Sequence, residues 1–270
     1  MESVLYRMNS LNLKDVAKKR ADVSTNICLY FSPGNNKIGF ENACLRGEEL
    51  VQWTETTELT TLTLTGHTEI DDIPAYPDSL DLHEVANLLS MFTSVRDLHF
   101  VNVDAKHPMV RKVLPFLESI RPRNLSTRNV IDNDNMVLKT LWSILSRGET
   151  KVFEVSESIF GSVLKDVVAM WIKTTSDWEG FKIQAPHSFA ECKAMAQMAE
   201  EVFGNWRNST EITTPSRKFD IESDHLKKMM EPSSFYEDHE KIREASVQVS
   251  IFEQENLFSI WFYKTDSYIS

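Results

Sequence analysis

The chain has 270 residues, of which 41% are hydrophobic and 26% charged, the balance of a soluble globular protein with one large domain or two ordinary ones. Its net charge of −11 argues against sequence-independent nucleic-acid binding, which needs a clustered excess of Lys and Arg. No run of about 18 apolar residues is present, so we expect no membrane-spanning helix. Three cysteines without a C-x-x-C pair, and a first segment unlike a signal peptide, indicate a cytoplasmic protein.

We expect residues 1–46 to form a lead segment that precedes the strand-and-helix repeats. Apolar side chains in residues 1–20 fall near helical spacing, and residues 26–31 have the composition of a strand. A turn rich in Pro, Gly and Asn follows, so residues 37–40 are a candidate hairpin partner for that strand.

Residues 47–186 carry a strand-then-helix rhythm. Two segments, Leu59-x-x-Leu62-x-Leu64 and Val95-x-x-Leu98-x-Phe100-x-x-Val103, have the strand pattern of a leucine-rich repeat. Alternation of apolar and polar side chains predicts strands at 60–65, 97–103, 124–131, 151–156 and 181–184. Helical spacing predicts helices at 81–92, 108–120, 135–147 and 158–173.

The spacing of these strands is nearly constant. With Leu98, Leu125, Phe153 and Phe181 as strand centres, the steps are 27, 28 and 28 residues, within the range of leucine-rich solenoids. We therefore expect an α/β fold, specifically a leucine-rich-repeat-like strand–helix solenoid. A plain α/β sheet would give similar spacing, so that alternative stays open.

Residues 187–270 have a different pattern. A long amphipathic helix is expected over 188–206, and the polar segment 207–218 is expected to be a loop. Residues 247–253 and 257–264 alternate apolar and polar side chains around a short turn, which predicts a β-hairpin. The helix and hairpin would cap the last repeat, because an end repeat otherwise exposes its apolar face.

The sequence contains no motif that requires an enzyme. There is no glycine-rich phosphate loop, no G-x-S-x-G elbow and no set of His, Cys or carboxylate side chains with metal-ligand spacing. We therefore expect no catalytic residue, no metal and no cofactor. An enzyme that uses carboxylates in a cleft remains an alternative, because distant acids can meet only in the folded chain.

The candidate partner-binding residues are the side chains between the inward-facing positions of the first two repeat strands. Successive side chains of a strand point to opposite faces, so these five point away from the core. Their hydroxyl, carboxylate and imidazole groups suit recognition of a protein partner, and a merely solvated row is the competing interpretation. The five residues are Thr61, Thr63, Thr65, Asp97 and His99.

Three stretches carry a family resemblance: the lead Met1-Glu2-Ser3-Val4, the segment Val167-Val168-Ala169-Met170-Trp171-Ile172-Lys173 with Gly180-Phe181-Lys182-Ile183, and the closing hairpin from Ala245 to Tyr263. They resemble a lineage-expanded group of nematode F-box-associated, leucine-rich-repeat-like proteins. The resemblance covers about half of the chain. It implies a substrate adaptor of a cullin-type ubiquitin ligase, with an N-terminal F-box that holds a Skp1-like linker and a C-terminal region that binds the target.

The sequence thus predicts a non-enzymatic protein-interaction scaffold, with substrate recognition for a cullin-type ligase as the leading hypothesis. The first 25 residues are shorter than a full F-box of several helices, and Leu5, Leu11 and Leu13 are a candidate remnant of one. An orphan binding module without the ligase link is therefore the second hypothesis. In this scheme residues 1–46 are the lead, 47–186 the repeats and 187–270 the cap.

Overall fold

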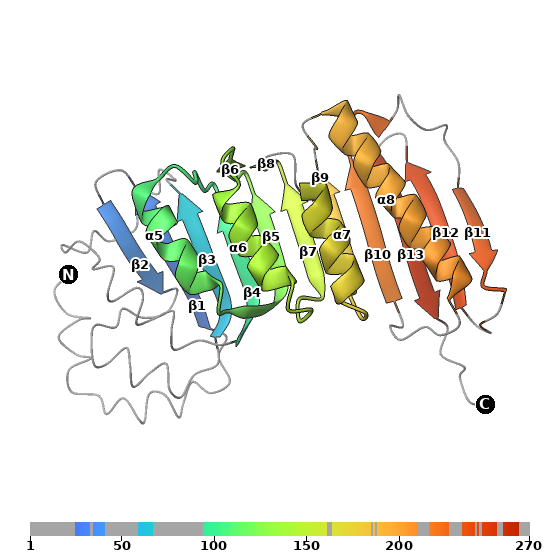
Figure 1. Cartoon of the computed structure of the whole chain (residues 1–270), viewed down its shortest axis with the longest axis horizontal. Coiled ribbons are helices and arrows are strands. Elements are labelled where there is room, and N and C mark those ends of the chain that lie inside the picture. Colours follow the sequence, from blue (N-terminus) through green and yellow to red (C-terminus); the bar gives the residue numbers. More distant parts are fainter. Residues whose placement is uncertain are drawn as a thin grey trace, which may run out of the picture.

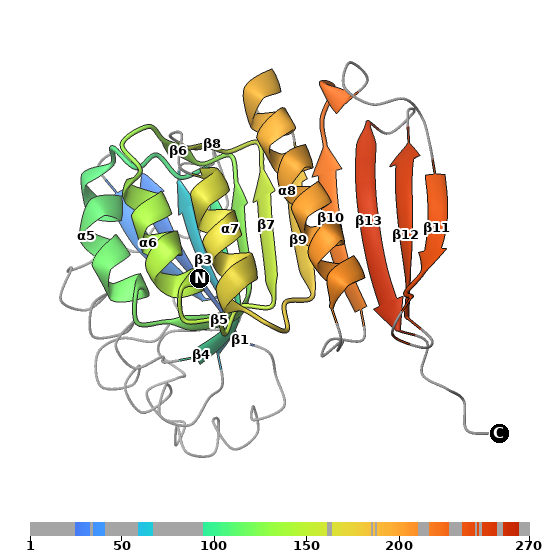
Figure 2. The same ribbon diagram turned by 45° about the vertical axis from the view of Figure 1, so that its right-hand side comes forward.

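The computed structural model describes residues 25–32, 35–40, 59–66, 94–160, 164–184, 186, 188–209, 216–226, 234–240, 242, 245–252 and 256–264. In these ranges the chain is an α/β protein with a large open mixed sheet and a second, small sheet. Figures 1 and 2 show the described helices side by side on one face of the large sheet. The opposite face carries none of them.

The large sheet has the strand order β11-β12-β13-β10-β9-β7-β5-β4-β3-β1-β2, and the small sheet pairs β6 with β8. The strands are β1 (Thr25–Ser32), β2 (Asn35–Phe40), β3 (Leu59–Gly66), β4 (Ser94–Val101), β5 (Arg121–Arg128), β6 (Ile131–Asp132), β7 (Val152–Ser156), β8 (Ile159–Phe160), β9 (Gly180–Gln184), β10 (Ser216–Glu222), β11 (Ser234–Asp238), β12 (Ala245–Phe252) and β13 (Leu257–Lys264).

The middle of the large sheet is parallel and follows the order of the chain from β1 through β3, β4, β5, β7 and β9 to β10. Its register pairs Leu62 with Leu98, Leu98 with Leu125, and Leu125 with Phe153. Phe153 in turn pairs with Phe181. The predicted strand centres are therefore confirmed as equivalent positions. The sheet continues across both predicted boundaries, at 46/47 and at 186/187.

Each described helix returns the chain to the start of the next parallel strand. Pro108 occupies the first turn of α5, where its missing N–H costs nothing. The carboxylate of Asp132 accepts hydrogen bonds from the backbone N–H groups of Met136 (2.7 Å) and Leu138 (2.8 Å) at the start of α6. The helices are α5 (Pro108–Leu117), α6 (Met136–Leu145), α7 (Leu164–Thr174) and α8 (Phe189–Asn208).

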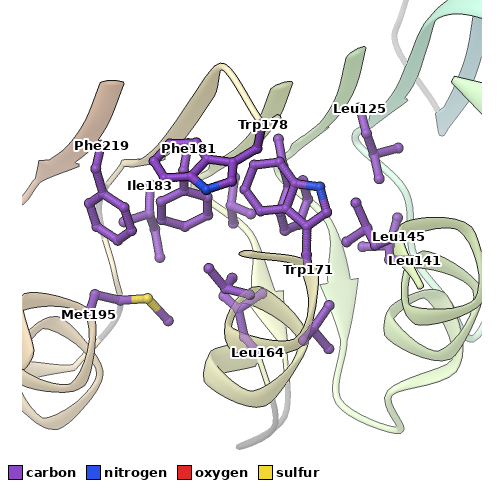
Figure 3. Close-up of a cluster of buried hydrophobic side chains, with 14 of the residues drawn as sticks. Leu125, Leu141, Leu145, Leu164, Trp171, Trp178, Phe181, Ile183, Met195 and Phe219 are labelled. Atoms are coloured by element: carbon purple, nitrogen blue, oxygen red, sulfur yellow. The ribbon is translucent and has the colours of Figure 1, made fainter. Parts of the chain in front are cut away.

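One apolar core lies between the helices and the sheet. Leu62, Leu98 and Phe153 are fully buried in it, as the repeat interpretation requires. Figure 3 shows its aromatic centre, where the ring centroids of Phe181 and Phe219 are 4.8 Å apart. Trp171 is also buried there, and its Nε1–H donates a hydrogen bond to the carbonyl of Thr150 (2.9 Å).

Three successive parallel strands end in the same backbone turn. Asn102, Asn129 and Glu157 have positive φ angles of 53°, 51° and 48°. Their N–H groups donate to the last carbonyl of the next strand, that of Arg128, Ser156 and Gln184 respectively. A positive φ ends a strand, which explains why β4 and β5 stop at 101 and 128 although the apolar pattern predicts ends at 103 and 131.

Several expected elements differ in the structure. The helix expected from residue 158 starts at Leu164, because Ile159 and Phe160 form β8 and pair with β6. The expected loop 207–218 contains the start of β10, and β11 was not anticipated. The hairpin β12–β13 is confirmed, but it joins the sheet edge to edge through β10. The helices expected in 1–20 and 81–92 lie outside the described residues.

Candidate functional site

The helix-free face of the large sheet carries the five predicted partner-binding residues. Thr61, Thr63 and Thr65 lie on β3, where Thr61 pairs with Asp97 and Thr63 with His99 on β4. The structure therefore brings the five together on neighbouring strands. Four of them are partly exposed, whereas Thr65 is buried and its hydroxyl donates to the carbonyl of Gly66 (3.1 Å), which makes it the least available of the set.

A ladder of side-chain hydrogen bonds begins at this end of the face. Asn124 Nδ2 on β5 donates to Asp97 Oδ1 at 2.6 Å, and His99 Nδ1 lies 2.6 Å from Ser126 Oγ. Burial lowers the pKa of His99, and the carboxylates of Asp97 and Glu154 oppose that shift only partly. A lowered pKa leaves His99 neutral at pH 7, so this end of the face offers hydrogen-bonding groups and a carboxylate.

The ladder continues across the middle of the sheet. Ser156 Oγ on β7 donates to Gln184 Oε1 on β9 (2.9 Å), and Gln184 Nε2 donates to Glu222 Oε1 on β10 (2.9 Å). Lys182 Nζ lies 3.3 Å from the other oxygen of Glu222. Each side chain is thus held by a neighbour one strand away, which fixes the positions of polar groups that a partner would meet.

On β10 the ladder reaches a buried carboxylate. Asp220 accepts a hydrogen bond from Ser259 Oγ on β13 at 2.6 Å and lies 2.7 Å from Lys218 Nζ. These contacts neutralise and satisfy Asp220, as a buried acid requires. The other buried carboxylate among the described residues, that of Asp132, serves as the cap of α6. Two buried acids that face one cleft, which the enzyme alternative needs, do not occur in these residues.

Beyond β10 the helix-free face becomes aromatic. Trp261 on β13 is 46% exposed and Tyr236 on β11 is 57% exposed, and both lie in one cross-strand row with Lys218 and Gln248. The ring of Tyr263 lies 5.7 Å from that of Trp261 and 6.2 Å from that of Tyr236. We call Trp261, Tyr236 and Tyr263 the aromatic trio.

Hydrogen bonds hold the trio in place. Trp261 Nε1 donates to Ser216 Oγ at 2.9 Å, and the hydroxyl of Tyr236 donates to Ser246 Oγ at 2.6 Å. Exposed aromatic rings with fixed positions are the residues that most often dominate the affinity of a protein interface. The trio was not predicted from the sequence. On β13, Trp261 and Tyr263 share the parity opposite to the buried Phe258, Ile260 and Phe262, but aromatic side chains occur at both parities, so the sequence does not identify the exposed ones.

The described residues contain neither a metal-binding cluster nor a membrane-spanning helix. They contain no group of three or more His, Cys, Asp or Glu side chains that could hold a metal ion. None of the helices within the described ranges combines the length and apolarity that a bilayer crossing requires. Cys192 is buried on α8, and burial raises the pKa of its thiol, so it has the character of a packing residue.

The fold and this face define an α/β protein with an open mixed sheet, covered by helices on one face and lined on the other by a polar ladder and an aromatic trio. Comparison of the chain with protein-family models, with curated proteins and with solved structures finds no match.

Proposed function

We propose that the chain is a non-enzymatic, cytoplasmic protein-interaction scaffold whose helix-free face binds a protein target. The observation that carries the proposal is the aromatic trio, of which Trp261 and Tyr236 are exposed, beside a hydrogen-bonded polar ladder on a face that none of the described helices covers. Protein interfaces combine such aromatic anchors with polar groups that fix orientation. The five residues Thr61, Thr63, Thr65, Asp97 and His99 form the far, polar end of the same face.

The finer architecture that we propose is a leucine-rich-repeat-like succession of strand and helix. The near-constant step between register-paired strand centres and the recurrence of one turn at Asn102, Asn129 and Glu157 support it. Stacked repeats present an extended surface, which is how such proteins bind partners.

The cellular role that we propose is substrate recognition for a cullin-type ubiquitin ligase. The resemblance to F-box-associated proteins supports this half of the proposal, and its segments coincide with α7 and β9 and with the hairpin β12–β13. In this scheme the helix-free face holds the target, while the first 25 residues contact a Skp1-like linker.

Affinity capture with matched variants tests both halves. The chain, a W261A/Y236A double variant and the control W142A are used as baits, since Trp142 is an exposed tryptophan on α6, away from the face. We expect the double variant to lose the target proteins that the chain and W142A retain. The variant T63R then tests whether the interface reaches the polar end, and we expect the same targets to be weakened.

The ligase half has a separate readout. Deletion of residues 1–25 is expected to remove a Skp1-like protein and cullin from the captured set and to leave the targets bound. Capture of targets without any Skp1-like or cullin component would refute the ligase role and leave the orphan binding module. Identical target sets for the chain and W261A/Y236A would refute the helix-free face as the interface.

A further inference from the structure

On the helix side, a cavity of about 550 Å³ lies between the C-terminal halves of α7 and α8. This volume is typical of small-molecule sites. Its inner wall is apolar and formed by buried side chains from the loop after α7, from α8 and from β13. They are Trp178, Met198, Val202, Trp206 and Phe262.

The guanidinium of Arg217 places a positive charge at an inward-facing position beside this wall. Arg217 shares the parity of Phe219 and Ile221 on β10, both of which are buried in the core. Its guanidinium lies 5.3 Å from the ring centroid of Trp178 and donates a hydrogen bond to the carbonyl of Ser176. Burial lowers the pKa of Arg217, but guanidinium stays protonated in proteins, so the cavity holds a partly desolvated positive charge.

The rim has a second cation and one anion. Lys173 on α7 and Glu201 on α8 both line the cavity and are exposed to solvent. Asp177 does not line the cavity, but its carboxylate attracts the charge of Arg217 and also forms an ion pair with Lys151. With Arg217 included, the charged side chains that line the cavity carry a net charge of +1, which favours an anionic ligand over a cationic one.

A buried donor on the wall also lacks an acceptor. Trp206 is 9% exposed, and its Nε1–H has no hydrogen-bond partner among the described residues. The indole is held by the rings of Phe203, Phe262 and His239, at centroid distances of 6.0, 5.6 and 4.7 Å. An unsatisfied buried donor costs about 1–3 kcal/mol, and a ligand oxygen would remove that cost.

We propose that this cavity binds an organic monocarboxylate with an apolar body. The carboxylate pairs with Arg217 and accepts the Nε1–H of Trp206, while the body packs on Met198, Val202 and Phe262. A neutral lipid alcohol would gain no charge–charge attraction from the guanidinium, and a cationic amphiphile would be repelled by it. Tyr263 of the aromatic trio also lines this cavity, whereas Trp261 and Tyr236 do not, and the site does not depend on the function proposed for the helix-free face.

Calorimetric titration with three probes of equal chain length tests the ligand class. The probes are dodecanoate, dodecanol and dodecyltrimethylammonium, each below its micelle concentration. We expect saturable one-to-one binding of dodecanoate, at least about tenfold tighter than dodecanol, and no binding of the ammonium probe. Absence of dodecanoate binding, or equal affinity for the three probes, would overturn the proposal.

Two sets of variants place the ligand in the cavity. Ala169 is an exposed cavity-lining residue on α7, so A169F fills space without disturbing the core, and A190F makes the same change at an exposed position of α8 away from the cavity. We expect A169F to abolish dodecanoate binding and A190F to preserve it. R217Q, checked for folding by circular dichroism, should remove the preference for dodecanoate over dodecanol. Unchanged binding in A169F or an unchanged preference in R217Q would place the ligand elsewhere and refute the site.

Discussion

Replacement of Phe181 by Ala removes the central ring of the core. Phe181 is 2% exposed, and its ring centroid lies 4.8 Å from that of Phe219, 5.9 Å from that of Phe153 and 6.3 Å from that of Trp171. Phe→Ala changes in packed cores cost about 3–5 kcal/mol. Because Phe181 lies between two paired strands and under a helix, its surroundings cannot close the gap, and we expect a loss of about 4 kcal/mol.

The free energy of unfolding is measured by urea denaturation followed by far-ultraviolet circular dichroism and tryptophan fluorescence. The matched control is F189A, because Phe189 is 45% exposed and its described ring contact is an edge-on approach to His225. We expect F189A to cost less than about 1 kcal/mol. A comparably small loss in F181A would refute the single core that joins the parallel strands to the hairpin.

Three further predictions concern single residues. Burial lowers the pKa of folded His99 below its ordinary 6.5, so the unfolded chain binds more protons and stability should fall as pH drops through 6.5. H99Q should remove that part of the pH dependence of the urea midpoint. An unchanged dependence of the midpoint on pH in H99Q would contradict the prediction. At Glu157, whose φ is 48°, E157N should raise stability by about 0.5–1 kcal/mol in thermal denaturation, because Asn tolerates this backbone region better than Glu. Finally, D132A leaves the N–H groups of Met136 and Leu138 without their acceptor and should cost about 2 kcal/mol, which hydrogen exchange at the start of α6 would localise.

The parallel strands could be predicted from the sequence because their spacing is set locally. A strand of fixed length followed by a returning helix places Leu98, Leu125 and Phe153 one step apart, and the register confirms this. The pairing of β6 with β8 could not be predicted in the same way. Ile159 and Phe160 continue an apolar pattern that is compatible with a helix, and their strand partner, Ile131–Asp132, is 28 residues earlier.

Strand β10 was missed because its own composition does not favour a strand. Four of the seven residues of Ser216–Glu222 are charged, and only Phe219 and Ile221 are apolar. The segment becomes a strand because it lies between β9 and β13 and hydrogen-bonds to both. Such a tertiary pairing overrides local propensity, and no pattern within seven residues records it.

On the helix-free face, the outward threonines of β3 could be predicted from the sequence, whereas the outward aromatic residues of β13 could not. The threonines of β3 alternate with leucines, so their outward direction is evident from the sequence. On β13 both parities contain aromatic side chains, and the sequence alone does not decide which parity faces the core. The position of α8 decides it: Trp206 packs against Phe262 with ring centroids 5.6 Å apart, which turns Trp261 to the other face.

The same alternation makes the two proposed sites separable by experiment. Phe262 lines the cavity on the helix side, while the neighbouring Trp261 projects from the helix-free face. Consequently W261A/Y236A should lose the captured targets and keep its affinity for dodecanoate, and A169F should show the opposite result. Circular dichroism would first confirm that both variants are folded. If either folded variant then lost both the targets and dodecanoate, the two-site model would be refuted, and target and carboxylate would have to share one site.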